Sequence, residues 1–120
     1  EQGRPVSGLR EGLPPRFTAS DRIKDFPTAL SRQRLAAMTG AGARPDPGAV
    51  EAVLGAAFGP VTAVDTTDGV RVTFRSGEIV HLRPSGNAPE LRAYTEADSP
   101  ERARAMVDAC VDMLAGWRDD

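Results

Sequence analysis

One short loop in the second half of the chain carries the residue types that bind a phosphate or a carboxylate. It reads Arg83-Pro84-Ser85-Gly86-Asn87-Ala88-Pro89, which combines a guanidinium, a hydroxyl and flexible backbone amides. The proline after Arg83 keeps this arginine extended, so its planar donor fork is presented at a fixed angle for bidentate hydrogen bonds. Gly86 can adopt a positive φ, which turns its own amide and those of Asn87 and Ala88 toward one point as an anion-binding nest. The same composition is typical of an ordinary turn, so both interpretations are open at this point.

Other residues that could do chemistry have simpler explanations. His81, the only histidine, lies two positions before Arg83 and shares its side of an alternating strand, but a histidine without a partner motif is expected to be a plain sheet-face residue. Cys110 and Trp117 fall on an apolar helical stripe and are expected to pack in the core. Asp65 and Asp68 are too few to form a metal site. We therefore predict no catalytic residue and no metal ligand in this chain.

Composition limits the class of protein. With 120 residues, 40% of them hydrophobic and 27% charged, the chain has room for one globular domain. Fifteen basic residues against 17 acidic ones, a net charge of -2, argue against nucleic-acid or anionic-membrane partners. A single cysteine excludes an internal disulfide, and the sequence has neither an apolar run of membrane-spanning length nor a signal-peptide pattern. These features predict a cytoplasmic protein.

The helices and strands that position the loop can be predicted from glycine and proline residues, which interrupt regular structure, and from the spacing of apolar residues. Residues 1–15 are rich in glycine and proline and are expected to form an interdomain linker or hinge, followed by a domain over 16–120. The sequence begins at Glu1 without an initiator methionine, and its first residues are typical of a connection on a protein surface. We therefore treat it as a piece of a longer protein. Asp46-Pro47 and Ser99-Pro100 are helix starts, and Asp68-Gly69 and Ser76-Gly77 are tight turns. The expected strands are 16–20, 61–66, 70–75, 78–83 and 91–97, and the expected helices are 28–38, 47–58 and 100–117.

These elements predict an α+β fold. The runs from residue 61 to residue 97 read as an antiparallel meander, and each helix has one apolar stripe to bury. We expect a four-stranded antiparallel sheet with the helices packed on one side.

The loop and its surroundings resemble a known enzyme family. Residues 82–92, Leu-Arg-Pro-Ser-Gly-Asn-Ala-Pro-Glu-Leu-Arg, followed by Tyr-Thr-Glu-Ala at 94–97, resemble the C-terminal phosphate-binding loop and next strand of the α-D-phosphohexomutases. That loop usually reads Arg-Pro-Ser-Gly-Thr-Glu-Pro, with an arginine three residues after its last proline. The positions that match in register are Arg83, Ser85, Gly86, Pro89 and Arg92. Asn87 replaces the usual threonine and Ala88 the usual glutamate, which leaves any role of that carboxylate unfilled. The stretches 17–28 and 64–72 also resemble bacterial phosphomannomutases, so the likeness spans most of residues 16–117.

The resemblance implies both a fold and a role. The chain would be the last of four domains, with a TATA-box-binding-protein-like fold, and would close over a phosphosugar together with the other domains of its chain. The parent reaction would interconvert mannose 6-phosphate and mannose 1-phosphate through a phosphoserine, with Mg²⁺ bound by another domain. Here Arg83 and Ser85 would contact the phosphate that is not transferred, with the amides of Gly86, Asn87 and Ala88 in support. Arg92 would either reach that phosphate or pair with Glu90 or Glu96.

The alternatives follow from what the chain lacks. The family's serine loop and metal loop are both absent, so the 120-residue chain is expected to be inactive alone. Its sugar-discriminating loop belongs to another domain, so a phosphoglucomutase using glucose 1- or 6-phosphate is the nearest alternative. A free-standing module that binds another anion for an interaction is the second alternative.

Overall fold

The computed structural model describes residues 16–40, 45–85 and 88–119. Within these residues, strand β2 (Phe17–Ile23) is followed by helices α1 (Thr28–Thr39) and α2 (Pro47–Phe58). Three strands then follow in sequence, β3 (Val61–Asp65), β4 (Val70–Phe74) and β5 (Ile79–Pro84). Strand β6 (Leu91–Ala97) and helix α3 (Pro100–Asp119) complete the described part of the chain. The predicted linker over residues 1–15 lies outside the described residues.

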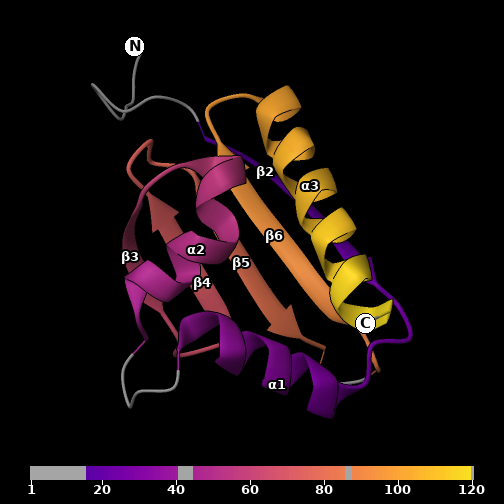
Figure 1. Cartoon of the computed structure of the whole chain (residues 1–120). Helices are drawn as coiled ribbons and strands as arrows, with labels where there is room; N and C mark the ends of the chain where they lie inside the picture. The colour runs from indigo at the N-terminus through magenta and orange to yellow at the C-terminus, as the bar shows by residue number, and fades with distance from the viewer. Residues whose placement is uncertain (1–15, 41–44, 86–87, 120) are drawn as a thin grey trace, which may run out of the picture.

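The five strands form one antiparallel sheet in the order β2-β6-β5-β4-β3 (Figure 1). The prediction of four strands was wrong, because β2 pairs with β6 over its full length, from Phe17 opposite Ala97 to Ile23 opposite Leu91. Strand pairing between segments about 70 residues apart cannot be read from local periodicity. Strand β2 therefore becomes the outermost strand beside β6, next to the loop that joins β5 to β6.

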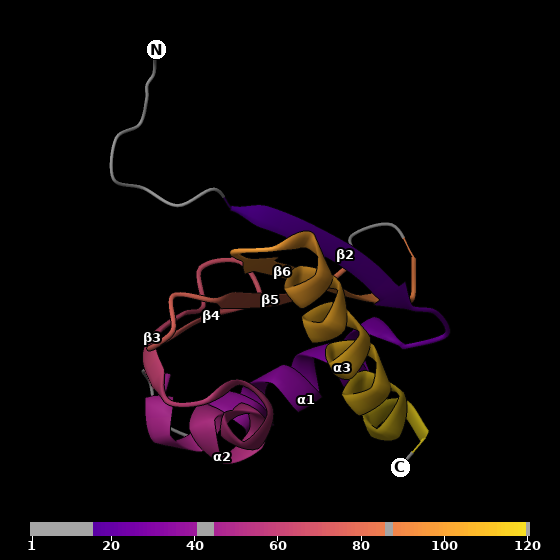
Figure 2. The same ribbon diagram turned by 90° about the horizontal axis from the view of Figure 1, so that it is seen from above.

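All three helices lie on one side of this sheet, as predicted (Figure 2). The other face is not covered by any element of the described residues. This α+β arrangement is consistent with the TATA-box-binding-protein-like fold that the resemblance implies.

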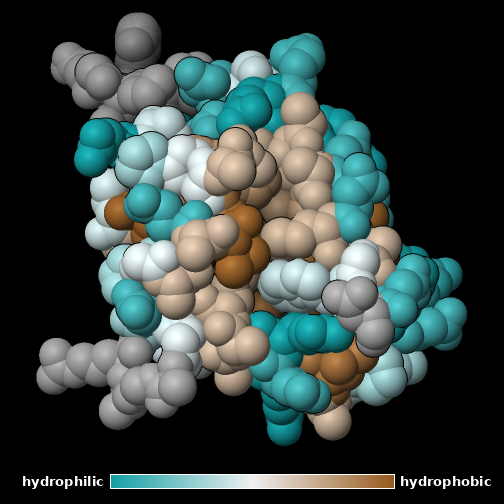
Figure 3. All heavy atoms as spheres, viewed as in Figure 1, coloured by the Kyte–Doolittle hydropathy of each residue, from teal (hydrophilic) through white to brown (hydrophobic). Residues whose placement is uncertain are grey.

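The side chains between sheet and helices form a single core. Alternate strand residues point into it, including Val70, Val72 and Phe74 on β4, which are at most 2% exposed. Helix α3 contributes Ala103, Met106, Val107, Cys110 and Leu114, as its stripe predicted. Met113 and Trp117, also on that stripe, are only partly buried against the core. On the helix side of the surface, apolar residues gather toward the middle and hydrophilic ones toward the rim (Figure 3).

The helix starts follow their sequence signals. The carboxylate of Asp46 accepts a hydrogen bond from the Gly48 amide at 2.9 Å, and Pro47 occupies the first helical position of α2. The Ser99 hydroxyl accepts from the Arg102 amide at 3.1 Å at the start of α3. No helix within the described residues combines the length and apolarity needed to cross a bilayer.

Candidate anion-binding site

The loop between β5 and β6 is fixed at both ends by backbone hydrogen bonds. The Ser85 amide donates to the Glu90 carbonyl at 2.9 Å, and the Glu90 amide donates to the Ala88 carbonyl at 2.8 Å. The Pro89 carbonyl accepts from the Phe26 amide at 2.7 Å, which ties the loop to the start of α1. Gly86 and Asn87 lie outside the described residues, so the predicted amide nest stays a prediction.

Three arginines stand opposite one another at this end of the sheet. In the antiparallel register, Arg92 on β6 is the direct partner of Arg83 on β5 and of Arg22 on β2. Residues directly opposite share a face, with Cβ atoms about 4.5–5.5 Å apart. Their buried neighbours Leu82, Leu91 and Ala93 point to the helices, so this arginine row lies on the uncovered face. Like charges placed directly opposite are destabilising, so such a row needs anions nearby.

Two carboxylates from neighbouring turns supply part of that negative charge. Asp68 Oδ2 lies 3.4 Å from Arg83 Nη1, and both side chains are exposed, by 60% and 42% respectively. Glu90 contacts the other two arginines, at 3.4 Å from Arg22 Nε and 3.8 Å from Arg92 Nη2. The Arg83–Asp68 pair is exposed and therefore weak, and the two contacts of Glu90, whose side chain is 15% exposed, are long, so an incoming dianion can compete with these pairs.

The turn that carries Asp68 approaches β5 closely. Gly69 has a φ of +70°, and a Cβ atom at this position would collide with the Leu82 carbonyl oxygen. Glycine is required both for the backbone conformation and for the approach. The turn is further shaped by Asp65, whose carboxylate accepts from the Thr67 amide at 2.8 Å. The hydrogen bonds from Thr67 lower the pKa of Asp65.

A second row of polar residues lies beside the arginines. His81 is opposite Tyr94 and Arg71, and it lies on the same face as Arg83, as the alternation predicted. Its ring centroid is 5.9 Å from that of Tyr94, and its Nε2 donates to the Asp68 carbonyl at 2.6 Å. A hydrogen bond between Arg92 and Tyr94 raises the pKa of Arg92. His81 thus holds the turn at Asp68, and Tyr94 holds the side chain of Arg92.

The predicted site residues are only partly brought together. Arg83 and Arg92 share a face, whereas Ser85 is 8% exposed and lines a hollow beneath α1. Arg92 pairs with Glu90, one of its two predicted partners, while the other, Glu96, pairs with Arg16 at 3.0 Å. Sequence reasoning missed Arg22 and Asp68. The Asp68-Gly69 turn signature could have indicated Asp68. No local sequence pattern indicated Arg22.

The described residues do not form a metal centre. No group of three or more histidine, cysteine, aspartate or glutamate side chains among them is placed to hold a metal ion. Cys110 is buried in the core, and burial raises the pKa of its thiol to about 12, which leaves it protonated.

Comparison with known proteins identifies relatives of this domain. The family model of the phosphoglucomutase/phosphomannomutase C-terminal domain matches residues 31–113. A phosphomannomutase of Salmonella muenchen is 38% identical over 103 residues, which cover 86% of this chain and 20% of that protein. A phosphomannomutase of Sinorhizobium fredii is 54% identical over 50 residues, 42% of this chain and 10% of that protein. A probable phosphoglucosamine mutase of Methanopyrus kandleri is 47% identical over 51 residues, 42% of this chain and 11% of that protein. The chain therefore spans between a tenth and a fifth of the length of these relatives.

Proposed function

Because the chain belongs to the phosphoglucomutase/phosphomannomutase C-terminal domain family, we propose that it is the phosphate-recognition domain of a phosphohexomutase. Its loop would hold the sugar phosphate that is not being transferred. The parent activity we propose is that of a phosphomannomutase, which interconverts mannose 6-phosphate and mannose 1-phosphate. Two of the relatives named above carry the name phosphomannomutase, and one of them matches 86% of this chain, which supports this choice of substrate.

The observation that carries the proposal is the arginine row beside the loop. Arg22, Arg83 and Arg92 occupy directly opposite positions on three strands, and each has only a weak acidic partner. A phosphate dianion would relieve their mutual repulsion and accept charge-assisted, bidentate hydrogen bonds from the guanidinium groups. The loop between β5 and β6 would supply further hydrogen-bond donors. We propose that these are Ser85 and the amides of Gly86, Asn87 and Ala88.

The role of such a grip is to bind and orient the substrate. Contacts to a phosphate remote from the reacting atoms supply binding energy that positions the sugar for chemistry performed elsewhere. The described residues do not fit a Mg²⁺ site, so the proposal assigns the metal and the reacting serine to other parts of the parent chain. Residues 1–15 would connect this domain to those parts, and the 120-residue chain alone would not turn over its substrate.

An NMR titration of the 120-residue chain with inorganic phosphate tests the proposal. We expect amide shifts at Ala88 and Glu90 and at the ends of β5 and β6. The dissociation constant should be on the order of millimolar, about -4 kcal/mol, because the other domains contribute nothing. Arg83→Ala should abolish these shifts.

Arg75→Ala is the matched control, since Arg75 is exposed at the far end of β4 and its removal changes the net charge equally. If Arg83→Ala and Arg75→Ala weaken phosphate binding to the same extent, the grip is refuted. Shifts confined to another surface would instead favour a free-standing anion-binding module.

A further inference from the structure

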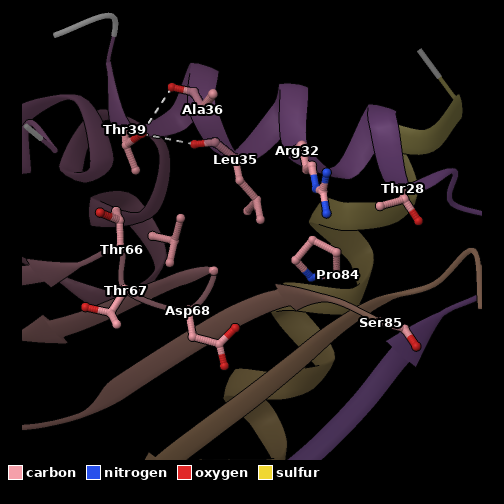
Figure 4. A pocket seen from close by; sticks show the side chains of 12 residues that line it. Thr28, Arg32, Leu35, Ala36, Thr39, Thr66, Thr67, Asp68, Pro84 and Ser85 are labelled. Atoms are coloured by element: carbon pink, nitrogen blue, oxygen red, sulfur yellow. Dashed lines mark hydrogen bonds between the residues drawn. The ribbon is translucent and has the colours of Figure 1, made fainter. Parts of the chain in front are cut away.

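Two hollows lie near the loop, on opposite sides of the sheet. The first lies on the helix side, where Arg32 and Leu35 project from α1 toward Pro84 (Figure 4). The second has a volume of about 110 Å³ and lies where β2 runs beside β6. This volume exceeds the ~30 Å³ of one water molecule and is well below the roughly 300–1,000 Å³ of sites for organic ligands, so it suits a small ion. The second hollow is lined by Ser20, Asp21, Arg22, Arg92 and Tyr94.

The second hollow belongs to the uncovered face, but it includes only part of the arginine row. Arg22 and Arg92 line it, whereas Arg83 reaches toward Asp68 in the β3–β4 turn, on the other side of β5 from β6. Neighbouring strands are about 4.8 Å apart, so the backbones of Arg22 and Arg83 are separated by about 10 Å, with Arg92 between them. A phosphate held by Arg83 and the loop would therefore leave the Arg22 end of the row without an anion.

The unengaged polar groups that line this hollow are hydrogen-bond donors. A guanidinium has no acceptor, so the Tyr94 oxygen accepts from Arg92 and its own O–H remains to donate. The Ser20 hydroxyl has no hydrogen-bond partner among the described residues. Asp21 is the one acid of the lining, and its carboxylate is engaged elsewhere. Its Oδ1 accepts from the Arg22 amide at 2.8 Å, and its Oδ2 lies 3.3 Å from a guanidinium nitrogen of Arg104 on α3.

The charges at this hollow also favour an anion. Among the described residues, Glu90 is the acid that pairs with Arg22 and Arg92, at 3.4 and 3.8 Å. One carboxylate between two guanidinium groups leaves a positive charge. A tetrahedral oxyanion has oxygens on all sides and can accept from two guanidinium groups and two hydroxyls at once, whereas a planar carboxylate has only two oxygens. The lining therefore fits a phosphate or a sulfate best.

We propose that the hollow between β2 and β6 is a second oxyanion site, in which Arg22, Arg92 and the hydroxyls of Ser20 and Tyr94 bind a tetrahedral anion. This inference goes beyond the proposed function, because the second anion is not the sugar phosphate that the loop would hold. Its source is either a free ion or a phosphate group carried by a larger molecule, since the hollow lies at the edge of the sheet.

An NMR titration of the 120-residue chain with sulfate locates the bound anions. Sulfate at concentrations on the order of 10 mM should shift two groups of amides, those of Ser85 and Ala88 in the loop and those of Ser20 and Arg22 in β2. Methyl phosphate and inorganic phosphate then distinguish the sources. A β2 response to both indicates a site that accepts a phosphate group of a larger molecule, whereas a response to inorganic phosphate alone indicates a site for the free ion.

Substitutions separate the two anion positions. Arg22→Ala should remove the β2 shifts and leave the loop shifts, whereas Arg83→Ala should do the reverse. Tyr94→Phe removes only a hydroxyl and keeps the ring in place, so it should weaken the β2 response by about twofold to tenfold without changing the loop response. Arg75→Ala, which removes an equal charge far from the hollow, should behave like the parent chain.

The possible results separate this inference from the proposed function. If the β2 amides do not respond while the loop amides do, the second site is refuted and the phosphate grip stands. If Arg22→Ala and Arg83→Ala each remove both groups of shifts, the row holds a single anion and the second site is again refuted. If the β2 amides respond while the loop amides do not, the second site stands and the phosphate grip is refuted.

Discussion

At the scale of single residues, the site is defined by arginines whose acidic partners are weak. Arg83 and Asp68 are 3.4 Å apart and both are largely exposed to solvent. If the loop binds a phosphate as proposed, the Asp68 carboxylate lies beside Arg83 where the ligand would otherwise lie. The same carboxylate would then have to give way when the phosphate binds, so it would oppose binding.

Replacing Asp68 should therefore strengthen phosphate binding. We expect Asp68→Asn to lower the dissociation constant for inorganic phosphate by about twofold to fivefold, the worth of an exposed ion pair. The Asp68 carbonyl keeps its hydrogen bond from His81, so the turn should stay in place. A titration followed by NMR measures the change, and Asp112→Asn on the exposed side of α3 controls for net charge. Weaker binding in Asp68→Asn would show that this carboxylate positions Arg83 more than it competes.

The sequence predicted only some of the residues that form the candidate site. Arg83, Ser85 and Arg92 could be predicted as candidates because the loop contains consecutive residues with donor groups and resembles a known motif, and their contact with a phosphate stays a prediction. Arg22 was missed because its place opposite Arg92 depends on the register of β2, which is set by packing between distant segments.

At the scale of elements, helix and strand boundaries were predicted well because their signals are local. Strand β6 has the predicted bounds, and α2 begins at the predicted proline. What fixes one element to another was not predicted. Arg102 near the start of α3 holds Glu78 before β5 through two hydrogen bonds, of 2.7 and 3.1 Å. The Thr95 hydroxyl donates to the Ala103 carbonyl at 2.7 Å, which fixes β6 to the same helix.

The Glu78–Arg102 pair should make stability depend on pH. The hydrogen bonds from Arg102 lower the pKa of Glu78 below its ordinary value of 4.5. A lowered pKa in the folded chain stabilises it above pH 4.5, and this contribution is lost as the pH falls through the folded-state pKa. Glu78→Gln should cost about 1 kcal/mol of unfolding free energy at neutral pH and clearly less at pH 3, below the ordinary pKa of the carboxyl group.

Urea unfolding at the two pH values measures this difference. Glu101→Gln, at an exposed position in the first turn of α3, serves as the control for the loss of a carboxylate. An equal cost of Glu78→Gln at both pH values would mean that packing, and not the ion pair, explains its effect.

At the scale of the whole molecule, the buried side chains form one core, so we expect the described part of the domain to unfold as one unit. Cys110, 1% exposed on α3, reports on that unit because its thiol is both inaccessible and protonated in the folded chain. We expect thiol reagents to modify it only in denaturant, at a rate that follows global unfolding. Met106→Ala, which removes a fully buried neighbour one helical turn away, should destabilise the fold by about 2–5 kcal/mol and speed the modification by more than tenfold. Rapid modification of the parent chain in native buffer would show that α3 opens locally.

The pairing of β2 with β6 has a consequence for where this domain can be divided. The family match begins at residue 31, after β2 and within α1. A chain cut there would leave β6 as an edge strand, with a row of unpaired backbone groups from Leu91 to Ala97. Such an edge invites pairing with the same edge of a second molecule. We expect residues 31–120 to self-associate in sedimentation experiments at concentrations where residues 16–120 stay monomeric. If the shorter chain is also monomeric, β2 is dispensable for protecting the sheet.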